Sequence, residues 1–153
     1  MLTSQGPKVL EFNARFGDPE TQVYLTRLEN DLVELLEASV DGTLAGQELK
    51  WDPRASVCVV MASEGYPGAY AKGRTIRGLD NANALPHTKV FHAGTMKAGE
   101  QIVTNGGRVL GVTALGKDLG SARAAVYAAV ERIHFDGAQF RRDIGAKALA
   151  AAT

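Results

Sequence analysis

S-V-C-V-V-M-A at Ser56–Ala62 is an apolar run rich in β-branched residues, and it predicts a buried strand. A turn-rich stretch that ends in Trp51-Asp52-Pro53 precedes the run. A loop containing Gly65, Pro67 and Gly68 follows it. We therefore expect the chain from this point on to be mostly β.

Several more strand-like segments lie downstream, at Thr75–Leu79, Lys89–Thr95, Gln101–Thr104, Arg108–Leu115 and Ala138–Arg142. Asn105-Gly106 predicts a tight type I′ hairpin that joins Ile102–Thr104 to Arg108–Leu115, because both central residues of such a turn need positive φ. Apolar residues at helical spacing predict a helix through Ser121–His134.

Upstream of the turn-rich stretch, leucines recur at three- and four-residue spacing. This pattern predicts one amphipathic helix, or two abutting helices, between Glu20 and Val40, with Asp41-Gly42 as its end. The change of character between Gly46 and Arg54 places a domain boundary there, which gives units 1–50 and 51–153. Antiparallel strands with packed helices indicate an α+β fold.

The composition is that of an ordinary soluble globular protein, with 45% hydrophobic and 22% charged residues among 153. Seventeen basic residues balance seventeen acidic ones, which gives no reason to expect nucleic acid or an anionic membrane as partner. No apolar run approaches the ~20 residues of a membrane helix, and no signal peptide is visible. The lone Cys58 excludes an internal disulfide and fits a reducing cytoplasm.

The stretch most suggestive of chemistry is V-L-E-F-N-A-R-F-G-D-P-E-T-Q at Val9–Gln22. If Val9–Phe16 forms a strand, its side chains alternate between two faces. The apolar face, fit for a core, carries Leu10, Phe12, Ala14 and Phe16. The polar face carries Glu11, Asn13 and Arg15. Asp18 is then expected to cap the following helix, with Pro19 at its first position.

The polar face suits a phosphate-bearing ligand with a hard cation. Glu11 and Asn13 offer the oxygen donors that Mg²⁺ and Mn²⁺ prefer, and Arg15 offers a fork of donors for a phosphate or carboxylate. A solvated strand face followed by a well-capped helix explains the same residues. Alternation alone does not separate these two interpretations.

E-F-N-A-R-F-G-D-P-E-T-Q closely resembles the signature of the glycinamide ribonucleotide synthetase (phosphoribosylamine–glycine ligase) family, ATP-grasp ligases of purine biosynthesis. Four later blocks resemble the family's C-terminal domain in the family's order: Trp51–Gly68, Lys89–Thr95, Val103–Ala114 and Phe140–Gly145. The commonest form of the first block has Cys where Ala14 stands here. The resemblance implies that residues 1–50 end an ATP-grasp domain and that 51–153 form a small, antiparallel, barrel-like domain.

The resemblance also implies a reaction, in which glycine is joined to 5-phosphoribosylamine with hydrolysis of ATP. Glu11 and Asn13 match the family's metal ligands, which would bridge ATP phosphates through Mg²⁺ or Mn²⁺. Arg15 would neutralise the glycine carboxylate or the transferring phosphoryl group as the catalytic residue.

At the substrate end, the resemblance implies that Gly17 allows close backbone approach and that Asp18 accepts a hydrogen bond from an amine. Arg108 would anchor the ribose phosphate. An exposed hairpin arginine and a helix-capping aspartate are the structural alternatives for Arg108 and Asp18.

Ligases of this family run to roughly three times this length, beyond the usual single-domain size. The chain is thus expected to be the C-terminal part of a cytoplasmic ligase, inactive alone, whose partner is the missing upstream half. Two other readings stay open. One is a non-catalytic module that binds a phosphoribosyl ligand, or a subunit of a split ATP-grasp ligase. The other is an ATP-grasp ligase with a different acceptor.

Overall fold

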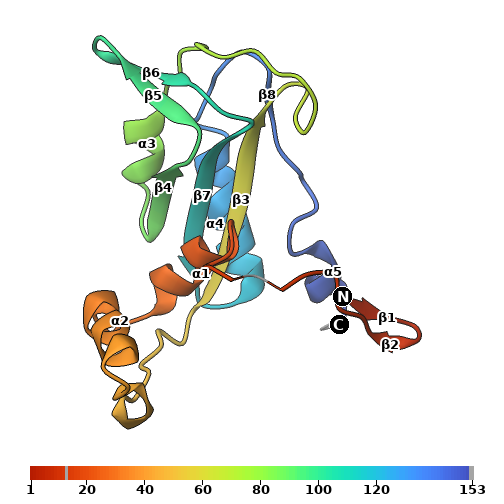
Figure 1. The fold of residues 1–153 in the computed structure, drawn as a ribbon. Helices are drawn as coiled ribbons and strands as arrows, with labels where there is room; N and C mark the ends of the chain where they lie inside the picture. Colours follow the sequence, from red (N-terminus) through yellow and green to blue (C-terminus); the bar gives the residue numbers. More distant parts are fainter. Residues whose placement is uncertain (13, 152–153) are drawn as a thin grey trace.

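A four-stranded antiparallel sheet forms the centre of the computed structural model, which describes residues 1–12 and 14–151. Its strands lie in the order β4 (Thr88–His92), β7 (Arg108–Gly116), β3 (Ala55–Ser63) and β8 (Ala138–Gln139) (Figure 1). β3 confirms the strand predicted from the apolar run at 56–62, and most of its residues are buried. The described sheet is open, with edges at β4 and β8, and the α+β class is confirmed.

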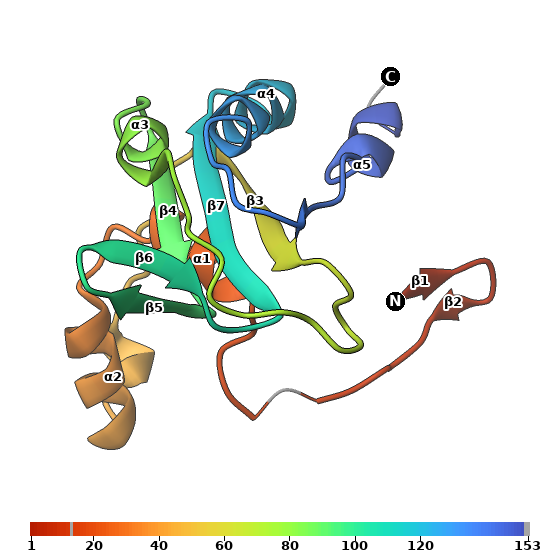
Figure 2. The same ribbon diagram turned by 90° about the horizontal axis from the view of Figure 1, so that it is seen from above.

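Two helices cover the two faces of this sheet. α4 (Leu119–Val130) packs on one face and α1 (Glu20–Arg27) on the other (Figure 2). The core lies under α4, where Val59, Met61 and Leu110 are at most 1% exposed. Full burial of each such side chain stabilises the fold by about 1.5–3 kcal/mol. The α4 helix begins two residues before the start of the predicted helix at 121–134 and ends four residues before its end. Asp118 is its N-cap.

The hairpin predicted at Asn105-Gly106 is wrong. β6 (Gln101–Thr104) pairs with β5 (Thr95–Ala98), while β7 pairs with β3 and β4. Neither Asn105 nor Gly106 has positive φ. Instead Asn105 N donates to the carbonyl of Gly94, and a Cβ on Gly106 would lie 2.8 Å from Gly94 Cα. This close backbone approach turns β6 away from β7.

The N-terminal region contains a short hairpin, β1 (Leu2–Thr3) and β2 (Gly6–Pro7), followed by α1, α2 (Leu32–Val40) and a 3₁₀ turn at Leu44–Gly46. Two separate helices therefore occupy the predicted 20–40 region. Asp41 ends α2, and Gly42 follows with φ of 72°.

The strand predicted at Val9–Phe16 is also wrong for the described residues. No described strand pairs with this segment, and a strand without a neighbour leaves its backbone groups and apolar face unsupported. Leu10, Phe12 and Phe16 are accordingly exposed by 72%, 90% and 55% instead of lying in a core.

Smaller differences occur at the margins of the sheet. The strand predicted at 75–79 is reduced to two isolated bridges, from Thr75 to Val103 and from Arg77 to His134. Two short helices, α3 (Leu79–Asn83) and α5 (Ala146–Ala150), complete the described chain, and the last strand is two residues long. Among the described helices, none is long and apolar enough to cross a membrane.

Candidate functional site

A β-bulge in β7 determines which way Arg108 points. Met61 pairs with Leu110, but the next residue of β3, Ala62, pairs with Arg108, so Val109 is an extra residue in β7. Opposed residues of an antiparallel pair share a face, so Arg108 lies on the same face as Ala62. Without the extra residue, Arg108 would share the core face of Leu110. The bulge therefore directs Arg108 to the α1 face of the sheet.

On that face Arg108 meets the segment that leads into α1. Its Nη1 donates to the carbonyl oxygen of Asp18 (2.6 Å) and lies 3.6 Å from the Asp18 carboxylate. Its Nε donates to the hydroxyl of Tyr66 (3.1 Å), and this bond raises the pKa of Arg108 above its ordinary value. Nη2 has no hydrogen-bond partner within residues 1–12 and 14–151. It therefore remains available to an anion.

Asp18 is not the N-cap of α1, contrary to the sequence prediction. Pro19 occupies the N-cap position, and no side chain forms a capping hydrogen bond there. Pro19 was predicted at the first helical position, but it lies one residue before it. The Asp18 carboxylate instead accepts a hydrogen bond from Gln22 Nε2 (2.9 Å) and faces Arg108. Its side chain stays 46% exposed. These contacts remove the capping explanation and leave the carboxylate beside Arg108.

A pocket of about 520 Å³ adjoins this contact. Arg108 and Tyr66 line it together with apolar side chains, among them Pro19, Val60, Phe140 and Ile144. Cys58 also lines it, and burial raises the pKa of the Cys58 thiol, as expected of an unreactive buried cysteine. The pocket thus combines an apolar wall with a guanidinium, which suits a ligand carrying an anionic group.

The other predicted site residues precede this contact along the chain. Glu11 is exposed, and Asn13 lies outside the described residues. Arg15 Nη1 donates to the neighbouring carbonyl of Phe16 (3.0 Å). A Cβ added to Gly17 would meet the carboxylate end of the flexible Glu20 side chain, so Gly17 lies close to the start of α1. Of the six predicted residues, the structure shows a direct contact between Asp18 and Arg108.

A family model described as "Phosphoribosylglycinamide synthetase, C domain" matches residues 56–147. The chain belongs to this family. It is 54% identical to the phosphoribosylamine–glycine ligase of Rhodopirellula baltica over an alignment of 153 residues, which covers 99% of this chain and 35% of that protein. It is also 54% identical to the ligase of Vibrio cholerae, over 98% of this chain and 35% of that protein.

The chain is also similar in structure to a solved member of this family. The crystal structure of phosphoribosylamine–glycine ligase from Thermotoga maritima is similar with a TM-score of 0.70 and 37% identity. The match covers 94% of this chain and 35% of that chain. The chain therefore spans about a third of the length of the synthetase relatives it matches.

For this synthetase-family chain, the described residues do not assemble a metal centre by themselves. They contain no group of three or more His, Cys, Asp or Glu side chains that could hold an ion. Glu11 supplies a carboxylate of the right chemistry for a hard cation, and it is exposed. The donor type fits Mg²⁺ or Mn²⁺, but most of a ligand shell would come from elsewhere.

Sequence reasoning missed Tyr66, which orients Arg108, and Gln22, which binds Asp18. An aromatic residue inside the Gly- and Pro-rich loop E-G-Y-P-G was the available signal for Tyr66. For Gln22 the signal was its position four residues after Asp18, because side chains at this spacing lie side by side along a helix.

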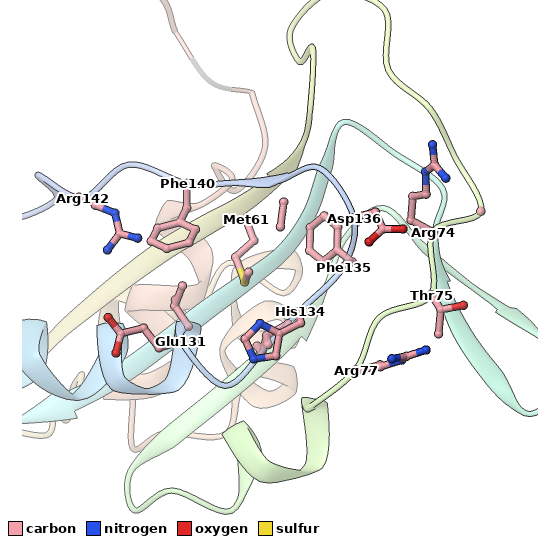
Figure 3. Close-up of a pocket in the computed structure, with 14 residues that line it drawn as sticks. Met61, Arg74, Thr75, Arg77, Glu131, His134, Phe135, Asp136, Phe140 and Arg142 are labelled. Atoms are coloured by element: carbon pink, nitrogen blue, oxygen red, sulfur yellow. The ribbon is translucent and has the colours of Figure 1, made fainter.

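A second cavity, of about 660 Å³, is lined by none of the six predicted site residues (Figure 3). Met61 lines it on the α4 face of β3, with Arg142 and Glu131 at one end and Arg74 and Arg77 at the other (Figure 3). Arg142 lies over the ring of Phe140 at 5.0 Å, and the neighbouring Arg141 pairs with Asp143 at 2.6 Å.

Proposed function

We propose that this chain is the C-terminal part of a phosphoribosylamine–glycine ligase of purine biosynthesis, working in the cytoplasm. The observation that carries the proposal is the contact between Asp18 and Arg108, because it joins two separate family motifs beside one pocket. Relatives 54% identical over nearly the whole chain bear that name. The substrates would be ATP, glycine and 5-phosphoribosylamine.

In such a reaction the glycine carboxylate attacks the γ-phosphorus of ATP, and ADP leaves. The amine of 5-phosphoribosylamine then attacks the acyl carbon of glycyl phosphate; the C–N bond forms, and phosphate and a proton depart. Arg108 would bind the ribose phosphate through Nη2, and Asp18 would accept a hydrogen bond from the amine. A cation and an anion side by side match a substrate that carries both groups.

Residues at the N-terminal end would serve the nucleotide. We assign Glu11 and Asn13 to a Mg²⁺ or Mn²⁺ ion that neutralises ATP phosphates when it is bound. Gly17 would allow the substrate to approach the backbone. Arg15 would stabilise negative charge on the glycine carboxylate or on the transferring phosphoryl group. This assignment is supported by the donor chemistry of Glu11, Asn13 and Arg15.

We also propose that residues 1–50 end an ATP-grasp domain and that residues 51–153 form the barrel-like C-terminal domain. Exposure supports this division, because twelve of the fifteen exposed large apolar side chains among the described residues lie in 1–50. An apolar surface of this extent marks a contact with another polypeptide segment. The upstream two-thirds of the relatives' length would supply that segment.

The test is reconstitution. The 153-residue chain is purified alone and also co-expressed with the upstream two-thirds of the Rhodopirellula baltica ligase. The co-purified pair is expected to release ADP only when glycine and phosphoribosylamine are both present, and Arg108→Met should abolish this release. The chain alone is expected to release none. A co-purified pair without glycine-dependent ADP release contradicts the proposal.

The exposed apolar surface also favours a second candidate, a subunit that completes a separately encoded ATP-grasp half. The other alternative, a stand-alone and non-catalytic module that binds a phosphoribosyl ligand, needs no partner. Co-purification distinguishes them, because a subunit forms a stable pair with the upstream part, whereas a stand-alone module binds ribose 5-phosphate and stays unassociated. Replacing glycine by other amino acids in the reconstituted assay tests which acid is activated, and replacing phosphoribosylamine by other amines tests the acceptor.

A further inference from the structure

We propose that Tyr66 is a positioning residue that fixes the Arg108 guanidinium for a phosphate group; this inference rests on the proposed function of Arg108. The Tyr66 hydroxyl accepts a hydrogen bond from Arg108 Nε at 3.1 Å. The carbonyl of Asp18 accepts a second from Nη1 at 2.6 Å. A planar group held at two of its nitrogens has a defined orientation, and its third nitrogen, Nη2, is left for the ligand.

The loop that carries Tyr66 is itself tied to both neighbouring strands. Gln139 Nε2 donates to the carbonyls of Ser63 (3.0 Å) and Tyr66 (3.3 Å). Ser63 Oγ donates to the carbonyl of Gly106 (2.9 Å), and Ser63 N donates to the carbonyl of Gly107 (2.8 Å). The base of the loop is therefore bonded directly to the segment that enters β7 at Arg108.

The Tyr66 ring lies against the residue next to Arg108. A Cβ added to Gly107 would overlap Tyr66 Cδ2, so only glycine leaves room for the ring there. The ring thus packs on Gly107 while the hydroxyl binds Arg108. Tyr66 fixes two consecutive residues, and the guanidinium is ordered before a phosphate arrives. Such preorganisation lowers the entropy cost of binding.

Tyr66→Phe removes the hydroxyl and keeps the ring. Tyr70→Phe is the matched control, since Tyr70 lies in the same loop, with its ring 6.4 Å from that of Tyr66. In calorimetric titrations of the 153-residue chain with ribose 5-phosphate, we expect Tyr66→Phe to weaken binding by about five- to tenfold. The control should bind like the unmodified chain, and both variants should keep its circular dichroism spectrum and unfolding midpoint.

A second measurement reads the positioning directly. The Arg108 Nε–H exchanges with solvent, and its exchange rate, followed by ¹H–¹⁵N NMR without ligand, should rise in Tyr66→Phe and stay unchanged in Tyr70→Phe. An unchanged exchange rate in Tyr66→Phe, or unchanged affinity while Arg108→Met loses binding, overturns the role of Tyr66 and leaves the proposed function standing. If the unmodified chain does not bind ribose 5-phosphate, the phosphate-anchoring role of Arg108 fails, and the role of Tyr66 fails with it, whereas the ligase assignment is decided by the reconstitution assay.

Discussion

Asp18 and Arg108 are 90 residues apart in the sequence, yet the Arg108 Nη1 atom contacts both the carbonyl and the carboxylate of Asp18. One residue precedes α1 and the other begins β7, so the contact depends on how α1 packs on the sheet. Both side chains are more than 40% exposed. The ion pair therefore contributes little to stability. Its significance lies in the charges that it presents to a ligand.

Asp18→Asn should raise the affinity for ribose 5-phosphate by about twofold or more, because a carboxylate near the phosphate site opposes an anion. Calorimetric titration at low salt measures the change. The control is Glu100→Gln, which removes an exposed acid from the β5–β6 turn. Weaker binding by Asp18→Asn would show that the carboxylate assists phosphate binding, against this account.

Gly107→Ala should disturb the site through Tyr66, since the new methyl group would overlap the tyrosine ring. We expect the free energy of unfolding to fall by about 1–3 kcal/mol in urea titrations. Ribose 5-phosphate affinity should fall with it. Gly46→Ala is the control, because nothing lies within 4 Å of a Cβ there. A Gly107→Ala variant as stable as the control would contradict the described packing.

The capping of α4 gives a prediction that does not depend on ligand. Asp118 accepts hydrogen bonds from Ser121 N and Ser121 Oγ, both at 2.7 Å. Asp118→Ala should lower the free energy of unfolding by about 1 kcal/mol, whereas Asp118→Asn, which keeps a capping oxygen, should change it much less. Equal losses in both variants would argue against a capping role.

Acid stability should depend on Asp52. The Arg54 side chain donates hydrogen bonds to the Asp52 carboxylate and lowers its pKa from 3.8 to about 2. The folded protein binds this proton less readily than the unfolded chain. The stabilising contribution is therefore fully present above about pH 4 and is lost as the pH falls through about 2.

In urea titrations at successive pH values, Asp52→Asn should reduce the loss of stability between pH 4 and 2. Part of the slope should remain, because hydrogen bonds also lower the pKa of Asp118 and Asp143. Glu100→Gln, in the exposed β5–β6 turn, is the control. An identical acid profile for Asp52→Asn and the unmodified chain would exclude this role.

Locally encoded features were predictable from the sequence. The apolar run at 56–62 forms β3, and the leucine spacing correctly predicted the helical region of α1 and α2 before residue 41. The strand at Val9–Phe16 was wrong because a strand needs a neighbour that the described residues do not supply. The prediction of a turn at Asn105-Gly106 was wrong because Gly94, which lies before β5 in the sequence, packs against Gly106.

The candidate site shows the same limit. Arg108 and Asp18 were proposed from family motifs, but their contact follows from a bulge at Val109 and from the packing of α1, neither of which has a local signature. Tyr66 was missed because its role appears only when the loop after β3 meets β7. Long-range packing, rather than residue type, decides which polar groups meet.

The central claim, that Arg108 anchors a ribose phosphate, is tested most directly by calorimetric titration of the 153-residue chain with ribose 5-phosphate. The unmodified chain should bind, and Arg108→Met should lose at least about tenfold in affinity. Arg77→Met, which removes an exposed arginine at the other cavity, should bind like the unmodified chain. Equal binding by Arg108→Met and the unmodified chain, or no binding by either, would contradict the account.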